Sequence, residues 1–299
     1  MTQHTEKKIL LAMDQSEYAF EAVKYLSRIS PLRKKRLVLF TVFSPIRDSY
    51  WDLEKEPVYA GKFGEISAWE ALRKKALKEH MSKAKQVLLS AGFSDTSVEI
   101  KLHQRKEGIA RDILSEAGQG YESLVIGRRG VSRVRGIVLG SVAAKLLQKN
   151  ISIPLLMVGR NARPGKILIA LDGSSSSMKA VDYAGEMFGE AGYDIRLTNV
   201  VRDEESDRIA EAEKRIAAVF NDATARLINS GISLNQINSQ IITGARSRAE
   251  AIIKEADQGG YGTIVVGKRG LSEARDFFMG SVSFKVVQLA RGRAVLVVS

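Results

Sequence analysis

Short apolar runs alternate with longer amphipathic stretches along the whole chain. The runs are rich in Ile, Val and Leu, and the stretches between them carry apolar residues at helical spacing. Continuous apolar runs of this length are typical of parallel strands buried on both faces, with helices as the crossover connections. The pattern therefore predicts an α/β fold with doubly wound sheets.

The apolar runs predict ten strands, five in each half, at 8–13, 36–43, 98–103, 123–126 and 154–158, and at 166–171, 194–200, 238–242, 263–266 and 294–298. About four helices fill the gaps in each half. The first helix opens near Ser16, with Ala19 and Val23 on its apolar stripe. The last helix of each half is expected to begin at Ser141 and at Ser281.

The sequence also contains an internal repeat, in which the second half resembles the first. The opening of each half aligns as KKILLAMD with GKILIALD, and the fourth strand aligns as YESLVIGRRG with YGTIVVGKRG. We expect two domains, at 1–160 and 161–299, joined by the polar segment GRNARPG at 159–165. The first half is longer, and we place its insertion near 45–66, beside the first pocket.

Composition and charge argue against several classes of site and partner. The 299 residues include no cysteine and only three scattered histidines, so we expect no disulfide and no metal site. The net charge of +12 falls almost wholly in the first half, without interleaved aromatic residues, which favours solvated helix faces over a nucleic-acid partner. No signal-peptide pattern and no apolar run near the roughly 20 residues of a membrane helix is present, so we expect a cytoplasmic protein and no membrane partner.

Each fourth strand leads into a glycine-rich segment. Gly127 and Gly130 are followed, nine residues later, by Gly140 and Ser141, and the second half repeats this spacing at Gly267, Gly270, Gly280 and Ser281. Glycine tolerates a left-handed backbone and lets a ligand approach main-chain N–H groups. A Gly-Ser pair at a helix start adds free N–H donors and the positive end of the helix dipole. This arrangement predicts a phosphate site.

An aspartate follows the first strand of each half, at Asp14 and Asp172. Ligands of open parallel sheets bind outside the carboxyl ends of the strands, so each aspartate is expected to face the glycine turn across one pocket. A nucleotide would place its phosphates at the glycines and a hydroxyl or amine near the carboxylate. The alternative is purely structural: the glycines permit a tight turn, and Ser141 and Asp14 cap helices.

The basic residues inside the glycine turns leave two interpretations open. Arg128, Arg129, Lys268 and Arg269 either reach phosphates or are exposed turn residues.

These motifs resemble those of universal stress protein domains, and the similarity covers nearly the whole chain outside the insertion. The Gly-2x-Gly-9x-Gly-Ser spacing is that family's ATP-binding motif. The resemblance implies strand order 3-2-1-4-5 in each half and ATP, accompanied by Mg²⁺, at the crevice between strands one and four. It also implies antiparallel pairing of the last strands, here within one chain, as an intramolecular pseudo-dimer.

The resemblance further assigns nucleotide-binding residues and no catalytic or metal-binding ones. In the first half these are Ala12, Asp14, Val42, Gly127, Arg129, Gly130, Gly140, Ser141 and Val142. In the second half they are Ala170, Asp172, Val200, Gly267, Arg269, Gly270, Gly280, Ser281 and Val282.

The resulting hypothesis is an ATP-binding stress-response protein that acts through nucleotide-dependent binding of a protein partner. Two alternatives stay open: a slow ATPase or phosphotransferase, and an interaction scaffold whose pockets are vestigial. A further homodimer of the whole chain also stays open.

Overall fold

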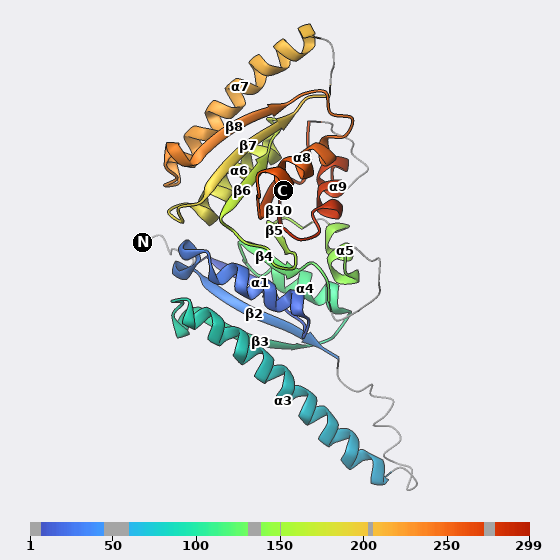
Figure 1. Ribbon diagram of the computed structural model, residues 1–299. Helices are drawn as coiled ribbons and strands as arrows, with labels where there is room; N and C mark the ends of the chain where they lie inside the picture. The colour runs from blue at the N-terminus through green and yellow to red at the C-terminus, as the bar shows by residue number, and fades with distance from the viewer. Residues whose placement is uncertain (1–6, 45–59, 131–138, 150, 203–205, 272–278) are drawn as a thin grey trace.

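The computed structural model describes residues 7–44, 60–130, 139–149, 151–202, 206–271 and 279–299, with the backbone alone at 60–67 and 206–212. These residues form two doubly wound halves that share one sheet (Figure 1).

The shared sheet has ten strands in the order β3-β2-β1-β4-β5-β10-β9-β6-β7-β8. Neighbours within each half are parallel, and both halves show the expected 3-2-1-4-5 order. Every predicted strand is present, with ends that move by a residue at most. The strands of the first half are β1 Lys8–Ala12, β2 Arg36–Phe43, β3 Val98–Gln104, β4 Ser123–Gly127 and β5 Leu155–Val158. Those of the second half are β6 Lys166–Ala170, β7 Asp194–Val200, β8 Ile237–Ile242, β9 Thr263–Gly267 and β10 Ala294–Val298.

Helices cover both faces of the sheet. One face carries α1 Glu17–Ser27, α3 Ala60–Ser90, α6 Ser175–Phe188 and α7 Ser206–Asn229. The other carries α4 Ile109–Ala117, α5 Ser141–Leu147, α8 Arg248–Gln258 and α9 Ser281–Leu289. Successive strand residues alternate between the two apolar cores, as the period of a strand requires. Among the described helices, none has an apolar stretch long enough to cross a bilayer.

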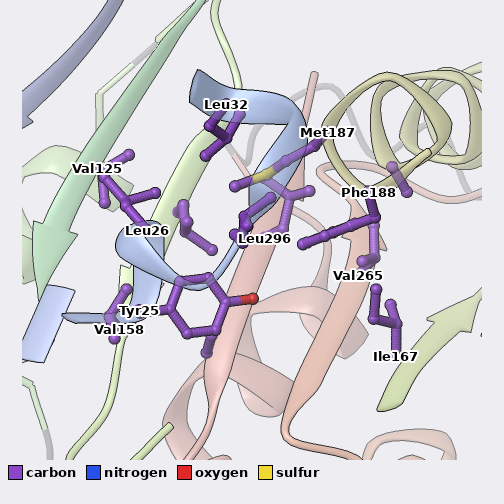
Figure 2. Close-up of a cluster of buried hydrophobic side chains, with 14 of the residues drawn as sticks. Tyr25, Leu26, Leu32, Val125, Val158, Ile167, Met187, Phe188, Val265 and Leu296 are labelled. Carbon is purple, nitrogen blue, oxygen red and sulfur yellow. The ribbon is translucent and has the colours of Figure 1, made fainter. Parts of the chain in front are cut away.

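The two halves meet at their last strands. Strands β5 and β10 pair antiparallel, with Val158 opposite Ala294 and Leu155 opposite Val297. On the α1 and α6 face the apolar core runs across this junction without interruption, as Figure 2 shows for side chains that include Tyr25 of the first half and Phe188 of the second. The expected intramolecular pseudo-dimer is therefore confirmed.

The insertion expected near 45–66 is described only in part. Residues 45–59 lie outside the described residues, and 60–66 are the first turns of α3. Helix α3 has 31 residues against 24 in its counterpart α7, and the two lie at opposite ends of the sheet (Figure 1). Part of the extra length of the first half is therefore helix.

Candidate functional site

Each half contains a cavity at the carboxyl end of its parallel strands. The first cavity, in the first half, has a volume of about 270 Å³ and the second about 410 Å³. Only the second falls within the roughly 300–1,000 Å³ that is usual for small-molecule sites. All eighteen residues predicted to bind nucleotide line these cavities. Ala12, Asp14, Val42, Gly127, Arg129, Gly130, Gly140, Ser141 and Val142 line the first, and Ala170, Asp172, Val200, Gly267, Arg269, Gly270, Gly280, Ser281 and Val282 line the second.

The two aspartates organise the strand ends. Asp172 accepts a hydrogen bond from the Ser174 N–H at 3.0 Å with one oxygen and from the Leu271 N–H at 3.0 Å with the other. Asp14 accepts the equivalent bond from the Ser16 N–H, also at 3.0 Å. The serines, and not the aspartates, cap α1 and α6, so the interpretation of Asp14 as a helix cap is wrong. Asp172 ties the end of β6 to the residue that follows its glycine turn.

The first two glycines of each motif are required by close approach. A Cβ on Gly127 would lie 2.7 Å from the backbone of α1, and one on Gly267 would lie 2.7 Å from the backbone of α6. A Cβ on Gly130 or Gly270 would lie 2.6 Å from a carboxylate oxygen of the aspartate in the same half. None of the four has a positive φ, so these positions require glycine for the close approach and not for a left-handed backbone. The absence of a Cβ at the first glycine leaves room for the backbone of the first helix of that half. The second glycine lies beside the aspartate at the cavity wall.

The last helix of each half starts at its cavity. Gly140 and Gly280 are the N-cap residues of α5 and α9, and neither helix has a side-chain cap. Ser141 and Ser281 are the first helical residues, as predicted, so the alternative that Ser141 is the cap is wrong. The uncapped first turn of α9 offers N–H donors at the wall of the second cavity, where an anion would be stabilised.

The first basic residue of each glycine turn crosses to the other half. Arg128 is 1% exposed and donates to the carbonyl oxygens of Ala290 at 2.9 Å and Gln288 at 3.0 Å, at the end of α9. Lys268 is 7% exposed and donates to the Ile151 carbonyl oxygen at 3.2 Å, just beyond the end of α5. Neither open interpretation, phosphate contact or exposed turn, holds for these two residues.

The burial of Arg128 and Lys268 has an electrostatic cost. Burial, together with the neighbouring positive charge of Arg129, lowers the pKa of Arg128 to about 10. Burial, together with Arg269, likewise lowers the pKa of Lys268. Cations at helix C-termini complement the exposed carbonyls and the helix dipole, which offsets part of that cost. Arg128 therefore binds the end of α9, which starts at the second cavity, and Lys268 binds the segment that follows α5, which starts at the first.

The second basic residue of each turn stays with its own cavity. Arg129 lines the first cavity, and its guanidinium lies 6.0 Å from the centre of the Tyr18 ring. Arg269 lines the second cavity and is exposed. These two residues remain candidates for phosphate contact.

Several lining residues escape an analysis based on the repeat, because the halves differ there. The second cavity also presents Thr198, Arg202, Arg215 and Arg248, and the first presents Met13, Phe40, Ile109 and Ile113. A duplicated motif draws attention only to residues that both copies share. In both cavities, the lining residues that the structure describes include one carboxylate, Asp14 or Asp172.

Known proteins share this architecture. A solved universal stress protein from Archaeoglobus fulgidus superposes with a TM-score of 0.67 at 19% identity, over 99% of both chains. A putative universal stress protein from Pseudomonas aeruginosa superposes with a TM-score of 0.58 at 20% identity, over 98% of this chain and 93% of that one. These two likenesses concern the fold.

Sequence relatives carry the same family name. A universal stress protein of Mycolicibacterium smegmatis is 23% identical over 201 residues, which span 66% of this chain and 64% of that protein. Universal stress protein YxiE of Bacillus subtilis is 28% identical over 142 residues, which span 42% of this chain and 93% of YxiE. The family model described as "Universal stress protein family" matches residues 6–159 and again residues 164–299. Because these two matches account for nearly the whole length, the chain belongs to the universal stress protein family and carries two copies of its domain in tandem.

Proposed function

We propose that this protein binds ATP in both cavities and that the bound nucleotide controls its association with a protein partner during stress. The observation that carries the proposal is a duplicated arrangement around each cavity: an aspartate after the first strand, a glycine turn after the fourth, and a helix that starts without a side-chain cap. Such a wall suits the phosphates of a nucleotide, because it combines N–H donors with a positive dipole end.

Binding, and not turnover, is the function that the cavity walls favour. Phosphoryl transfer requires a metal clamp, a positioned nucleophile and stabilisation of the transition-state charge. The one carboxylate lining the described part of each cavity already accepts backbone hydrogen bonds, at Asp14 from Ser16 and at Asp172 from Ser174. Mg²⁺ would then accompany the phosphates of ATP without a dedicated protein cage.

If the bound nucleotide controls the binding of a protein partner, its effect on the structure must extend beyond the cavity. The reciprocal contacts of Arg128 and Lys268 provide a physical connection, because Arg128 joins its glycine turn to the end of α9 and Lys268 joins its own to the segment after α5. Amide hydrogen exchange of the full chain with and without Mg-ATP measures this effect. We expect slower exchange in α5 and α9 with nucleotide, and unchanged exchange in both would contradict the regulatory part of the proposal.

The binding sites are tested by calorimetric titration of nucleotide-free protein with Mg-ATP. We expect two equivalents at saturation in the unmodified chain, one each in Gly130→Ala and Gly270→Ala, and none in the double variant. The added methyl group displaces the aspartate carboxylate that lies 2.6 Å from its position. Gly165→Ala is the matched control, because its Cβ would meet no atom within 4 Å.

Two equivalents in the double variant would refute the assigned sites. Phosphate release from Mg-ATP above that of buffer, abolished in the same double variant, would replace the binding function with a hydrolytic one.

A further inference from the structure

The two cavities occupy equivalent places but differ at the end away from the glycine turn. Arg248 and Ile109 are the first residues of the equivalent helices α8 and α4, and each lines the cavity of its own half. Thr198 and Phe40 are equivalent by register, because Ala170 pairs with Thr198 as Ala12 pairs with Phe40. An arginine and a threonine thus stand in the second cavity where the first has two apolar side chains.

The shape of the second cavity fixes which part of a nucleotide meets these residues. Its phosphate end is formed by Gly270 after β9 and by Ser281 at the start of α9. Arg248 and Thr198 belong to the β7 end, two strands away across β6, which is about 10 Å at the usual strand spacing. That distance is comparable with the length of a nucleoside, so a nucleotide held by its phosphates at Gly270 places its base against β7.

From these differences we propose that the second cavity selects a purine nucleotide with a carbonyl oxygen at the 6-position, a guanine or hypoxanthine nucleotide, over an adenine nucleotide. The inference rests on the proposed function for the phosphate end of the cavity, and it replaces ATP with a 6-oxopurine nucleotide as the preferred ligand of the second cavity. It assigns Arg248 as the residue that reads the 6-position.

The donor pattern of Arg248 supports this assignment. Its Nε donates to the Val200 carbonyl oxygen at 3.2 Å, which holds the guanidinium at the end of β7 and occupies a main-chain acceptor. Within the described residues no other side chain or carbonyl accepts from its terminal nitrogens. A guanidinium only donates, so it pairs with the O6 and N7 acceptors of guanine and opposes the 6-amino group of adenine.

Thr198 indicates that a polar group of the ligand binds at this end of the cavity. It is fully buried, it lines the cavity, and its hydroxyl has no hydrogen-bond partner among the described residues. Side-chain alternation along β7 puts it on the same face as Val200, beside the expected base. A buried hydroxyl without a partner is costly. It would be satisfied by N1 of either purine, because it accepts from the N1–H of a 6-oxopurine and donates to the N1 of adenine, so the choice between them rests on Arg248. At the equivalent position of the first cavity, Phe40 offers only an apolar ring.

The charge around the second cavity agrees with an acceptor-rich ligand. Arg202 and Arg215 line it together with Arg248 and Arg269, and among the described lining residues Asp172 is the one carboxylate. Among the described residues, the first cavity is lined by one arginine, Arg129, against Asp14. Electron-rich base edges and phosphates both gain from this excess of positive charge.

The test is a calorimetric titration of the Gly130→Ala chain with Mg-ATP, Mg-GTP and Mg-ITP, with hydrogen exchange at α8 to locate the bound ligand. We expect GTP and ITP to bind about tenfold more tightly than ATP, the discrimination of one bidentate arginine–guanine pair. Arg248→Ile, which copies the first cavity, should remove the preference. Arg246→Ile is the charge-matched control, because Arg246 is exposed and lies outside the cavity lining.

The outcomes separate the two proposals. ATP binding as tightly as GTP, or a preference for GTP that ITP does not share, would overturn the assignment of the 6-position. A preference that survives Arg248→Ile would overturn the role of Arg248. Absence of binding by all three nucleotides would instead overturn the proposed function of this half.

Discussion

The adjacent residues Arg128 and Arg129 allow stability and ligand binding to be separated in one experiment. Arg128 is 1% exposed and holds the end of α9, whereas Arg129 lines the first cavity. We predict that Arg128→Met lowers the free energy of unfolding by about 2–4 kcal/mol, since it removes charged donors from at least two helix-end carbonyls at about 1–3 kcal/mol each. Methionine keeps most of the apolar stem and so limits any cavity.

The assay is urea denaturation followed by circular dichroism, with a thermal scan in support. A loss of this size corresponds to a fall in Tm of roughly 5–10 °C for a chain of this class. Arg129→Met is the matched control, and we expect it to change stability by no more than about 0.5 kcal/mol while it weakens nucleotide binding in the first cavity. Unchanged or higher stability in Arg128→Met would show that the cost of burying the guanidinium exceeds the worth of its hydrogen bonds, and would refute this reasoning.

Two further predictions concern stability. Gly127→Ala should destabilise the fold by about 1–3 kcal/mol, because the new methyl group meets helix backbone at 2.7 Å, whereas Gly165→Ala should leave the urea midpoint unchanged; equal midpoints for both would contradict the packing argument. Glu116 is buried, which by itself raises its pKa, but hydrogen bonds from Lys101 at 2.8 Å and Tyr121 at 2.7 Å lower it below 4.5 overall. A depressed folded-state pKa adds stability above about pH 4.5 that is lost as the pH falls through it, so Glu116→Gln should flatten the fall in urea midpoint between pH 5 and pH 3, and an unchanged slope would count against this role.

The sheet could be predicted closely from the sequence. Fully buried parallel strands appear as short apolar runs, and the duplication gave each run a second copy at the expected place, so that β2, β7 and β10 match their predicted bounds in full. The helix starts at Ser141 and Ser281 could also be predicted, because a Gly-Ser pair after a polar segment strongly indicates the beginning of a helix.

The sequence could not predict that Arg128 is buried against the other half whereas its neighbour Arg129 lines the first cavity. The backbone N–H of Arg128 continues the strand ladder to Val158 at 2.9 Å, so Arg128 and Arg129 leave the strand end in different directions. Which direction leads to the other half depends on the antiparallel pairing of β5 with β10, a contact between segments far apart in the chain. Arg248 and Thr198 escaped notice for another reason, since a comparison of the halves is blind to positions where they have diverged.

The antiparallel junction of β5 and β10 also changes how this molecule can evolve. Two separate copies of one domain would have to meet through a self-complementary surface, and their association would weaken on dilution. In the tandem chain the partner strand is tethered by a short linker, at an effective concentration of the order of millimolar, so pairing is independent of protein concentration. Each half then needs to match only its neighbour and not itself. Arg128 can therefore face the end of α9 while Lys268 faces the segment after α5, and one cavity can change its lining while the other keeps its own.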